Sequence, residues 1–512
     1  MQESWSHDGI DASTKFAQNS CTMPAPTATP MRIALDPRSP APIYRQIYGR
    51  IRGAILSGTL PAGARLPSWN ALASELGVAR GTVRAAYEWL AGEGYIRAEG
   101  AAGTRVNLGF GPGAREAARK RREAGAGARK RGAPRDAVGL APWGLPPRPF
   151  QVGMPALDAF PRDLWTRLLA RHARGLAPSM MAYPDPAGDP ALREAIMSYL
   201  AVARGVDCAR GQVFITAGYT GALDLITRAL LRPGDAAWFE DPGYPRGRDA
   251  LKLAGASLVP VPVDAEGLIV TRGIAAAPEA RFAVVTASHH APLGMPLSLS
   301  RRLALLGWAS ESQGWIIEDD YYGEFQFRGR PVPALKSLDR GDRVLYVGTF
   351  SKVLMPSLRL GYVVAPAALA DRLRRVASLL VPSQSLTAQR AVAAFLAEGH
   401  FARHIRRMRR IYAERRAALV EALGAEFGSA WEIGLQESGM HLLAHLPWGS
   451  DDAALVERAA AEGLGPVALS PWSIRARSRP GLLIGFANIP AARAARETAR
   501  LAAALRSGRG PR

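Results

Sequence analysis

The chain has 512 residues, and its 65 Lys and Arg residues outnumber its 44 Asp and Glu residues, giving a formal net charge of +21. This charge excludes an acidic solvating protein and makes a polyanion the first partner to consider. Apolar residues make up 48% of the chain, which is enough to bury large cores, and the length predicts two or more domains.

Cysteine content and apolar runs indicate the cellular compartment of the protein. The two cysteines, Cys21 and Cys208, stand in unrelated contexts, so neither a disulfide framework nor a Cys-type zinc site is expected. The N-terminus lacks the pattern of a secretory leader, and no uncharged apolar run approaches the roughly 18 residues that span a bilayer. A cytoplasmic protein without membrane contact is therefore predicted.

The first quarter of the chain predicts a tail and a small helical domain. Residues 1–40 are rich in Ser, Thr and Pro and have no apolar period, which predicts a disordered tail. Residues 41–108 show amphipathic helical spacing and then a Gly-rich turn between two β-type runs. Helices are expected at 43–58, 69–76 and 80–91, and a two-stranded ribbon at 94–97 and 104–106.

Three helices closed by a β-ribbon predict a winged helix-turn-helix that binds double-stranded DNA. The third helix would enter the major groove with its first turn, while residues before the second helix and at the wing tip contact the backbone. The alternative is that these side chains are ordinary solvated positions. The candidate DNA-binding residues are Arg65, Ser68, Arg80, Thr82, Arg84, Gly103 and Thr104.

Residues 109–148 are expected to form a flexible basic linker. Its part from 111 to 135 holds nine basic and two acidic residues, the densest positive charge in the chain. Such a segment predicts salt-dependent, sequence-independent affinity for DNA that flanks a specific site.

From 149 to 512, β-type runs alternate with helical runs. This alternation predicts an α/β fold with right-handed crossovers, a mostly parallel sheet and helices on both faces. Strands are expected at 213–216, 237–240, 282–286, 315–318, 344–347 and 359–364, and helices at 222–231 and 299–312.

Only six residues are lysines, and one of them, Lys352, has a setting that suggests chemistry. It follows a predicted strand, Thr349 and Ser351 precede it, and Arg359 follows seven residues later. An amine beside phosphate-binding groups is what pyridoxal 5′-phosphate requires, since the aldehyde reacts with the amine. The alternative is a solvated surface lysine.

Three other segments add to this interpretation. The acids at 318–320 end an apolar run, so a carboxylate there can pair with a pyridine nitrogen, although a Mg²⁺ site is the alternative. Residues 216–223 read as a strand, a glycine turn and a helix start that offers backbone N–H groups to an anion. Tyr244 supplies an aromatic ring for stacking.

Two stretches of the chain resemble known families. PIYRQI at 42–47, ILSGTLPAGARLPS at 55–68, LGVARGTV at 76–83 and EGYI at 93–96 resemble the GntR family of bacterial transcription regulators. YPDPAG at 183–188, SHHAPLG at 288–294 and GTFSKVLMPSLR at 348–359 resemble fold type I aminotransferases. The combination resembles the MocR-type subfamily of GntR regulators, and the similarity spans about residues 42 to 490.

That resemblance implies a role for each matching residue. Lys352 would be the internal-aldimine lysine, Asp319 would pair with the pyridine nitrogen, Tyr321 would bind the ring hydroxyl, and Tyr244 would stack on the ring. Arg246 and His289 would lie on the substrate side. The phosphate would be held by Tyr219, Thr220, Ser351 and Arg359, with Tyr183 reaching it from the partner subunit of a homodimer.

Several positions depart from the family patterns. Ala291 stands where aminotransferases usually have Asn, and residues 481–486 read GLLIGF where they commonly have an Arg for the substrate carboxylate. These losses affect turnover more than cofactor binding, so a sensor is favoured over an efficient enzyme, although a residual half-reaction is compatible with the sequence. Asn70 and Gly81 also depart from the GntR pattern, so the operator sequence does not carry over.

The sequence therefore predicts a PLP-dependent transcriptional regulator whose operator binding responds to an amine, an amino acid or PLP at Lys352. An active aminotransferase that carries a DNA-binding head is the main alternative, and a cofactor-free dimerisation scaffold is a third. No metal site is expected, because the His pairs at 400/404 and 441/445 lack a clustered acid.

Overall fold

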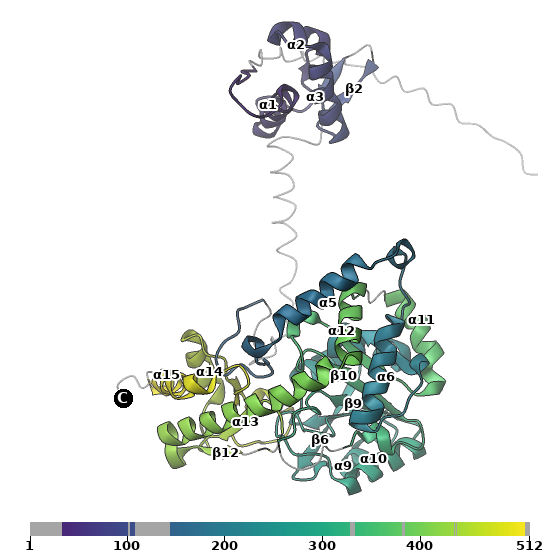
Figure 1. Cartoon of the computed structure of the whole chain (residues 1–512), viewed down its shortest axis with the longest axis vertical. Coiled ribbons are helices and arrows are strands. Elements are labelled where there is room, and N and C mark those ends of the chain that lie inside the picture. The colour runs from purple at the N-terminus through teal and green to yellow at the C-terminus, as the bar shows by residue number, and fades with distance from the viewer. Residues whose placement is uncertain are drawn as a thin grey trace, which may run out of the picture. The chain divides into compact units, whose positions relative to one another are not determined.

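A computed structural model describes residues 33–100, 103–107, 144–327, 333–380, 384–434, 436 and 438–506. The chain forms two compact units, Met1–Pro134 and Arg135–Arg512 (Figure 1). The basic segment 111–135 and most of the expected tail lie outside the described residues. In the described part, no helix is long and apolar enough to cross a membrane.

The N-terminal unit is a three-helix domain with a small sheet, and all three predicted helices are present. The apolar stripe of the first helix, Ile47, Ile51 and Ile55, is fully buried against the third helix. Ile33, inside the predicted tail, packs into the same core. The helices are α1 (Ile43–Ser57), α2 (Trp69–Leu76) and α3 (Arg80–Gly92).

The sheet of this unit has three strands rather than the predicted two. The additional strand pairs antiparallel with β3, in the order β1-β3-β2. It spans only two residues, too few for any alternation of apolar side chains to appear in the sequence. The strands are β1 (Arg65–Leu66), β2 (Ile96–Ala98) and β3 (Thr104–Val106).

The C-terminal unit is built on an eight-stranded mixed sheet of order β4-β11-β10-β9-β8-β5-β6-β7. Five neighbouring strands, from β10 to β6, run parallel to one another, while β11 is antiparallel to both of its neighbours. The strands are β4 (Val213–Thr216), β5 (Ala236–Asp241), β6 (Ser257–Asp264), β7 (Gly267–Leu268), β8 (Phe282–Val285), β9 (Trp315–Asp320), β10 (Val344–Thr349) and β11 (Gly361–Val364).

Helices cover both faces of this sheet, as predicted. In β9, Trp315 and Ile317 pack with one helical layer and Ile316 with the other, because successive side chains of a strand point to opposite faces. The helices of this part are α5 (Arg162–Arg174), α6 (Pro190–Arg204), α7 (Gly218–Leu230), α8 (Pro245–Leu253), α9 (Val270–Ala276), α10 (Leu299–Glu311), α11 (Ala370–Leu380) and α12 (Leu386–Ala397).

A second, smaller α+β part follows in the same unit. The long helix α13 runs from the region of α12 to α14 and α15, which lie at the opposite end from α11 (Figure 1). Its antiparallel sheet has the order β12-β13-β15-β14. The elements are α13 (His400–Phe427), β12 (Glu432–Gly434), β13 (His441–His445), α14 (Asp452–Ala461), β14 (Val467–Ala468), β15 (Gly481–Gly485) and α15 (Ala494–Arg506).

Two predicted boundaries were wrong next to glycines. Helix α7 starts at Gly218, earlier than the expected residue 222, and Gly218 has a φ of +70°. The strand expected from residue 359 starts at Gly361, because Arg359 adopts the left-handed conformation with a φ of +51°. Gly218 and Arg359 lie next to each other, where the turn before β11 meets the start of α7.

The buried face of α1 gives a test of the N-terminal core. Ile51→Ala should destabilise this unit by about 2 to 5 kcal/mol, because a fully buried Ile leaves a cavity when it is truncated. Ile43→Ala on the same helix is the matched control, since Ile43 is 46% exposed, and it should change stability by less than about 1 kcal/mol. Calorimetric unfolding of both variants measures the difference, and equal effects would contradict the packing.

Candidate functional site

The exposed start of α3 carries the predicted DNA-reading residues. Arg80 and Arg84 are exposed, and Thr82 is partly exposed. Arg84 Nε lies 2.9 Å from Glu88 Oε1, one turn further on. Within the described residues no ion pair or hydrogen bond of the Arg80 side chain is found, so Arg80 is the more available of the two for an external anion.

The other predicted DNA contacts lie at the start of α2 and on the small sheet. Ser68 Oγ accepts a hydrogen bond from the Ala71 N–H at 3.1 Å and caps α2, so its hydroxyl hydrogen can still be donated to a phosphate. Arg65 Nε lies 3.0 Å from where a Cβ of Gly103 would stand. The pairing of β1 with β3 places Thr104 opposite Leu66, beside Arg65.

In the C-terminal unit, five strands lead into the candidate cofactor site. The carboxyl ends of β4, β5, β8, β9 and β10, with the turns and helix starts that follow them, carry the predicted residues. Open α/β sheets bind ligands at the carboxyl ends of their parallel strands. In chain order these residues are Tyr219, Thr220, Tyr244, Arg246, His289, Asp319, Tyr321, Ser351 and Lys352.

The Lys352 side chain is half-buried, and its amine is hydrogen-bonded to the backbone of a glycine. Its Nζ donates a hydrogen bond to the Gly153 carbonyl at 3.1 Å, and a Cβ at Gly153 would collide with Nζ. Burial lowers the pKa of Lys352 to about 8, with Asp319 opposing the change and Arg246 and Arg359 adding to it. At pH 7 roughly a tenth of this amine is therefore neutral and able to act as a nucleophile, far more than of an ordinary lysine.

Asp319 is a buried carboxylate that forms no ion pair within the described residues. The Tyr219 hydroxyl donates a hydrogen bond to it. Burial, and then the neighbouring charges of Asp320 and Glu240, raise the pKa of Asp319 well above its usual range. A protonated ring nitrogen placed against this carboxylate would restore its charge.

A buried ion pair lies behind Asp319. Arg204 Nη2 lies 2.5 Å from Asp320 Oδ2, which also accepts a hydrogen bond from the Tyr346 hydroxyl at 2.7 Å. Arg204 also donates to Ser288 Oγ at 2.7 Å and so links this pair to the turn after β8. Arg204 thus offsets part of the charge of Asp320, the acid next to Asp319.

The start of α7 is the candidate anion site. Its first turn has no side-chain cap, so its N–H groups are free to bind a phosphate. Arg359 Nη2 donates to the Ala217 carbonyl at 3.1 Å and lies over Gly218. The Tyr219 hydroxyl is hydrogen-bonded to Asp319, so the group that Tyr219 can offer to a phosphate is its backbone N–H.

The remaining ring contacts fit a planar aromatic group. Tyr321 Oη is buried and has no hydrogen-bond partner among the described residues, so it is available for a ring hydroxyl. The Tyr244 ring lies 5.9 Å from that of Tyr219 and 5.7 Å from that of Trp472, measured between centroids. The carboxylate, the amine, the anion site and this hydroxyl together fit pyridoxal phosphate.

Three contributors to the site were not predicted. Gly153 and Arg204 lie far from the motifs, and no local pattern marked either residue. His441 was noted only for its spacing to His445, yet its ring lies 5.9 Å from that of His289. His404 Nε2 lies 2.8 Å from the Val353 carbonyl oxygen. Among the described residues, no three His, Cys, Asp or Glu side chains are grouped so that they could hold a metal ion.

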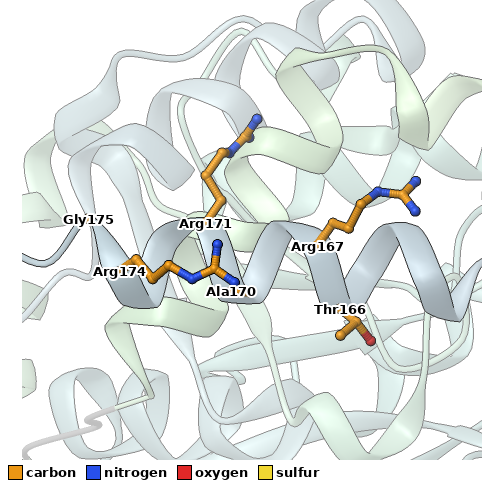
Figure 2. Close-up of a pocket in the computed structure, with 6 residues that line it drawn as sticks. All are labelled: Thr166, Arg167, Ala170, Arg171, Arg174 and Gly175. Carbon is orange, nitrogen blue, oxygen red and sulfur yellow. The ribbon is translucent and has the colours of Figure 1, made fainter.

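Two features lie apart from these groups. Tyr183, expected to reach the phosphate of a partner subunit, is fully exposed, as is most of Met181. A shallow hollow on α5 displays three arginines and includes none of the residues around Lys352 (Figure 2). The hollow is lined by Thr166, Arg167, Ala170, Arg171, Arg174 and Gly175.

Comparison with known proteins defines the class. Residues 43–106 match the bacterial regulatory proteins of the gntR family, and residues 157–472 match the class I and II aminotransferases. Among solved structures, an archaeal alanine:glyoxylate aminotransferase aligns with a TM-score of 0.65 and 25% identity, over 71% of this chain and 92% of that one. The protein thus combines a helix-turn-helix domain with an aminotransferase-like domain.

Two relatives that align over about nine tenths of the chain narrow the assignment. The "Probable rhizopine catabolism regulatory protein MocR" of Rhizobium meliloti is 39% identical, over 89% of this chain and 92% of the relative. The HTH-type transcriptional regulator TauR of Rhodobacter capsulatus is 35% identical, over 92% and 98%. The chain belongs to the MocR-type subfamily of GntR transcriptional regulators.

The two arginines of α3 give a matched pair of substitutions. Arg80→Ala should weaken operator binding by about tenfold or more, because it removes a cation that has no internal partner. Arg84→Ala should cost less, about two- to threefold, because Glu88 already competes for its guanidinium. Fluorescence anisotropy with a labelled operator measures both, and a larger loss for Arg84→Ala would reverse the assignment.

The lowered pKa of Lys352 predicts the pH dependence of cofactor capture. Only the neutral amine reacts, so the rate at which the cofactor-free protein captures pyridoxal phosphate should rise with pH with a midpoint of about 8. Stopped-flow absorbance measures this rate, and the reaction of a free lysine derivative corrects for titration of the aldehyde. Lys352→Ala should abolish capture, whereas the exposed control Lys252→Ala should leave it unchanged. A corrected midpoint near that of free lysine would contradict the assigned environment.

Proposed function

We propose that this protein is a PLP-dependent transcriptional regulator whose affinity for operator DNA changes when an amine, an amino acid or PLP itself binds at Lys352. The observation that carries the proposal is the half-buried amine of Lys352 between a buried carboxylate and an anion site, in a chain that also has a helix-turn-helix domain. Pyridoxal phosphate, when bound, supplies an aldehyde and an electron-withdrawing ring.

Each residue of the site would bind a different part of the cofactor. Lys352 offers the amine, Asp319 holds the ring nitrogen, and Tyr321 binds the ring hydroxyl. The first turn of α7 and Arg359 bind the phosphate. A ligand that displaces the Lys352 amine breaks the hydrogen bond between Lys352 and Gly153. Ligand binding can therefore alter the segment around Gly153, which follows the linker in the chain.

A homodimer is part of the proposal. Tyr183 is fully exposed although it lies in a motif that reaches the phosphate of the partner subunit in this family, so its exposure is consistent with a contact between two chains. Two helix-turn-helix domains in one dimer would read two half-sites of double-stranded operator DNA.

Lys352 is the position that tests the proposed function. In an electrophoretic mobility shift titration, Lys352→Ala should bind operator DNA within about threefold of the wild type when no effector is present. It should also lose at least about 90% of the change in affinity that PLP and amines produce. Lys252→Ala, on the exposed side of α8, should respond normally. An unchanged response in Lys352→Ala would end the sensing role.

An active aminotransferase is the second candidate, favoured by the similarity to solved aminotransferases. Incubation of the PLP-loaded protein with a panel of amino acids, followed by chromatography for pyridoxamine phosphate, separates the two. Accumulation at enzymatic rates supports the enzyme, and its absence together with an effector response supports the regulator. A colourless protein after addition of PLP would favour a cofactor-free scaffold.

A further inference from the structure

Two helices of the C-terminal unit carry exposed arginines that take no part in the cofactor site. Residues 164–184, which include most of α5, hold no Asp or Glu, and residues 400–413 of α13 hold none either. Small residues leave room beside the guanidinium groups of α5, where Thr166, Ala170 and Gly175 line the hollow (Figure 2). The arginine belt, as we name this set, consists of Arg167, Arg171, Arg174, Arg406, Arg407 and Arg410.

One carboxylate lies between the two helices of the belt. Glu398, at the C-terminal end of α12, pairs with Arg171 of α5. Its Oε2 lies 3.2 Å from His400 Nε2, at the start of α13. Arg403 Nη2 lies 2.6 Å from the other ring nitrogen of His400, Nδ1. These contacts connect the exposed face of α5 with that of α13, so the belt is one surface rather than two separate groups of charges.

The arginines of α13 are crowded on the solvent face of the helix. Arg406 and Arg410 are four residues apart, and Arg407 and Arg410 are three apart, so these side chains are neighbours on the helix surface. The opposite face packs into the core through Ile405 and Met408. Neighbouring like charges destabilise a helix, so this arrangement is unfavourable for the free protein. An external anion between the guanidinium groups would remove the repulsion.

Internal acids leave most of the belt without a counter-charge. The second half of α13 is different, because three Glu residues are interspersed there and one of them, Glu426, lies 3.2 Å from Arg506. Five guanidinium groups of the belt are available to an external anion. Among the described residues, no ion pair or hydrogen bond is found for the side chains of Arg167, Arg174, Arg406, Arg407 and Arg410.

We propose that the arginine belt binds the phosphate backbone of double-stranded DNA, in addition to the contacts made by the helix-turn-helix domain. Guanidinium groups donate paired hydrogen bonds to phosphate oxygens, and each phosphate that they neutralise releases a bound counterion. The belt contacts the backbone rather than base edges, so it binds DNA without regard to sequence. Because the helix-turn-helix domain belongs to the same chain, DNA held there reaches the belt at a high effective concentration.

The charge of the C-terminal unit favours DNA over a second copy of this chain as the occupant. Residues 149–512 hold 44 basic and 33 acidic residues, so two such units repel each other at long range. DNA offers a regular row of phosphates, which suits arginines repeated along two helices. The inference rests on the DNA binding of the proposed function and involves neither Lys352 nor the cofactor.

The salt dependence of DNA binding tests the belt. The full chain is titrated into a labelled, mixed-sequence duplex of about 60 base pairs at several salt concentrations, and fluorescence anisotropy gives the binding constant K. Each phosphate contact adds about one to the steepness of log K against log[salt], so loss of three belt arginines should lower the slope by about two to three. Binding at about 0.1 M salt should weaken by at least about tenfold. The α13 variant carries Arg406→Gln, Arg407→Gln and Arg410→Gln.

A matched control removes the same charge from exposed arginines that already have an acidic partner. It should lower the slope by less than about one, because these arginines lie outside the belt. An equal decrease in the control and the α13 variant would overturn the proposal, since net charge alone would then explain the effect. The control carries Arg210→Gln, Arg228→Gln and Arg496→Gln.

The α5 side of the belt is tested by a double variant. Arg167→Gln together with Arg174→Gln should lower the slope by about one to two, because neither guanidinium has a partner among the described residues. Arg171 stays in place, so that Glu398 keeps its partner. An unchanged slope in this variant would overturn the belt as one surface.

Two further observations separate the belt from a protein interface and from the proposed function. Sedimentation velocity should give the same mass for the wild type and the α13 variant. A lower mass in the variant would assign these arginines to a contact between chains and overturn the proposal. If the wild type binds no duplex, the DNA binding of the proposed function fails as well. If it binds and the α13 variant keeps the wild-type slope, only the belt fails.

Discussion

The arrangement of the C-terminal unit depends on holding one amine close to a buried carboxylate without letting the two form a complete ion pair. Lys352 donates to a backbone carbonyl, and Asp319 takes its hydrogen bond from a tyrosine. A direct, closed pair would leave neither group free for a ligand. Arg204 pairs instead with the adjacent acid, Asp320, which leaves Asp319 as the acid that a cationic ring nitrogen could pair with.

The sheet topology explains how the anion site comes to lie beside this amine. The strands around β10 are parallel, so their carboxyl ends meet at one edge. Strand β11 is antiparallel to both neighbours, which brings its amino end to that same edge. Arg359, just before β11, therefore meets the first turn of α7. The left-handed backbone at Arg359 and the glycine at 361 make this close approach possible.

The sequence predicted the parts of the site that follow strands and missed those that are reached only through the fold. Lys352, Asp319 and Arg359 stand in contiguous motifs, and the alternation of strands and helices places them at one edge. Gly153 is 199 positions from Lys352, and its only signal is the space that it leaves for the amine. The ring contact of His441 with His289 likewise arises from the packing of the four-stranded sheet of the C-terminal unit. A single sequence does not show such a contact.

A sensor and an enzyme place different demands on one site. An enzyme must bind a transition state more tightly than its substrate, whereas a sensor needs only a ligand that binds two conformations unequally. Coupling between effector and operator sites typically amounts to about 1 to 3 kcal/mol, which is the worth of one or two buried hydrogen bonds. The hydrogen bond from Lys352 Nζ to the Gly153 carbonyl, which a ligand at this amine would replace, is of this size. An arginine that orients a substrate carboxylate serves the transition state, so apolar residues in its place at 481–486 would matter more to an enzyme than to a regulator.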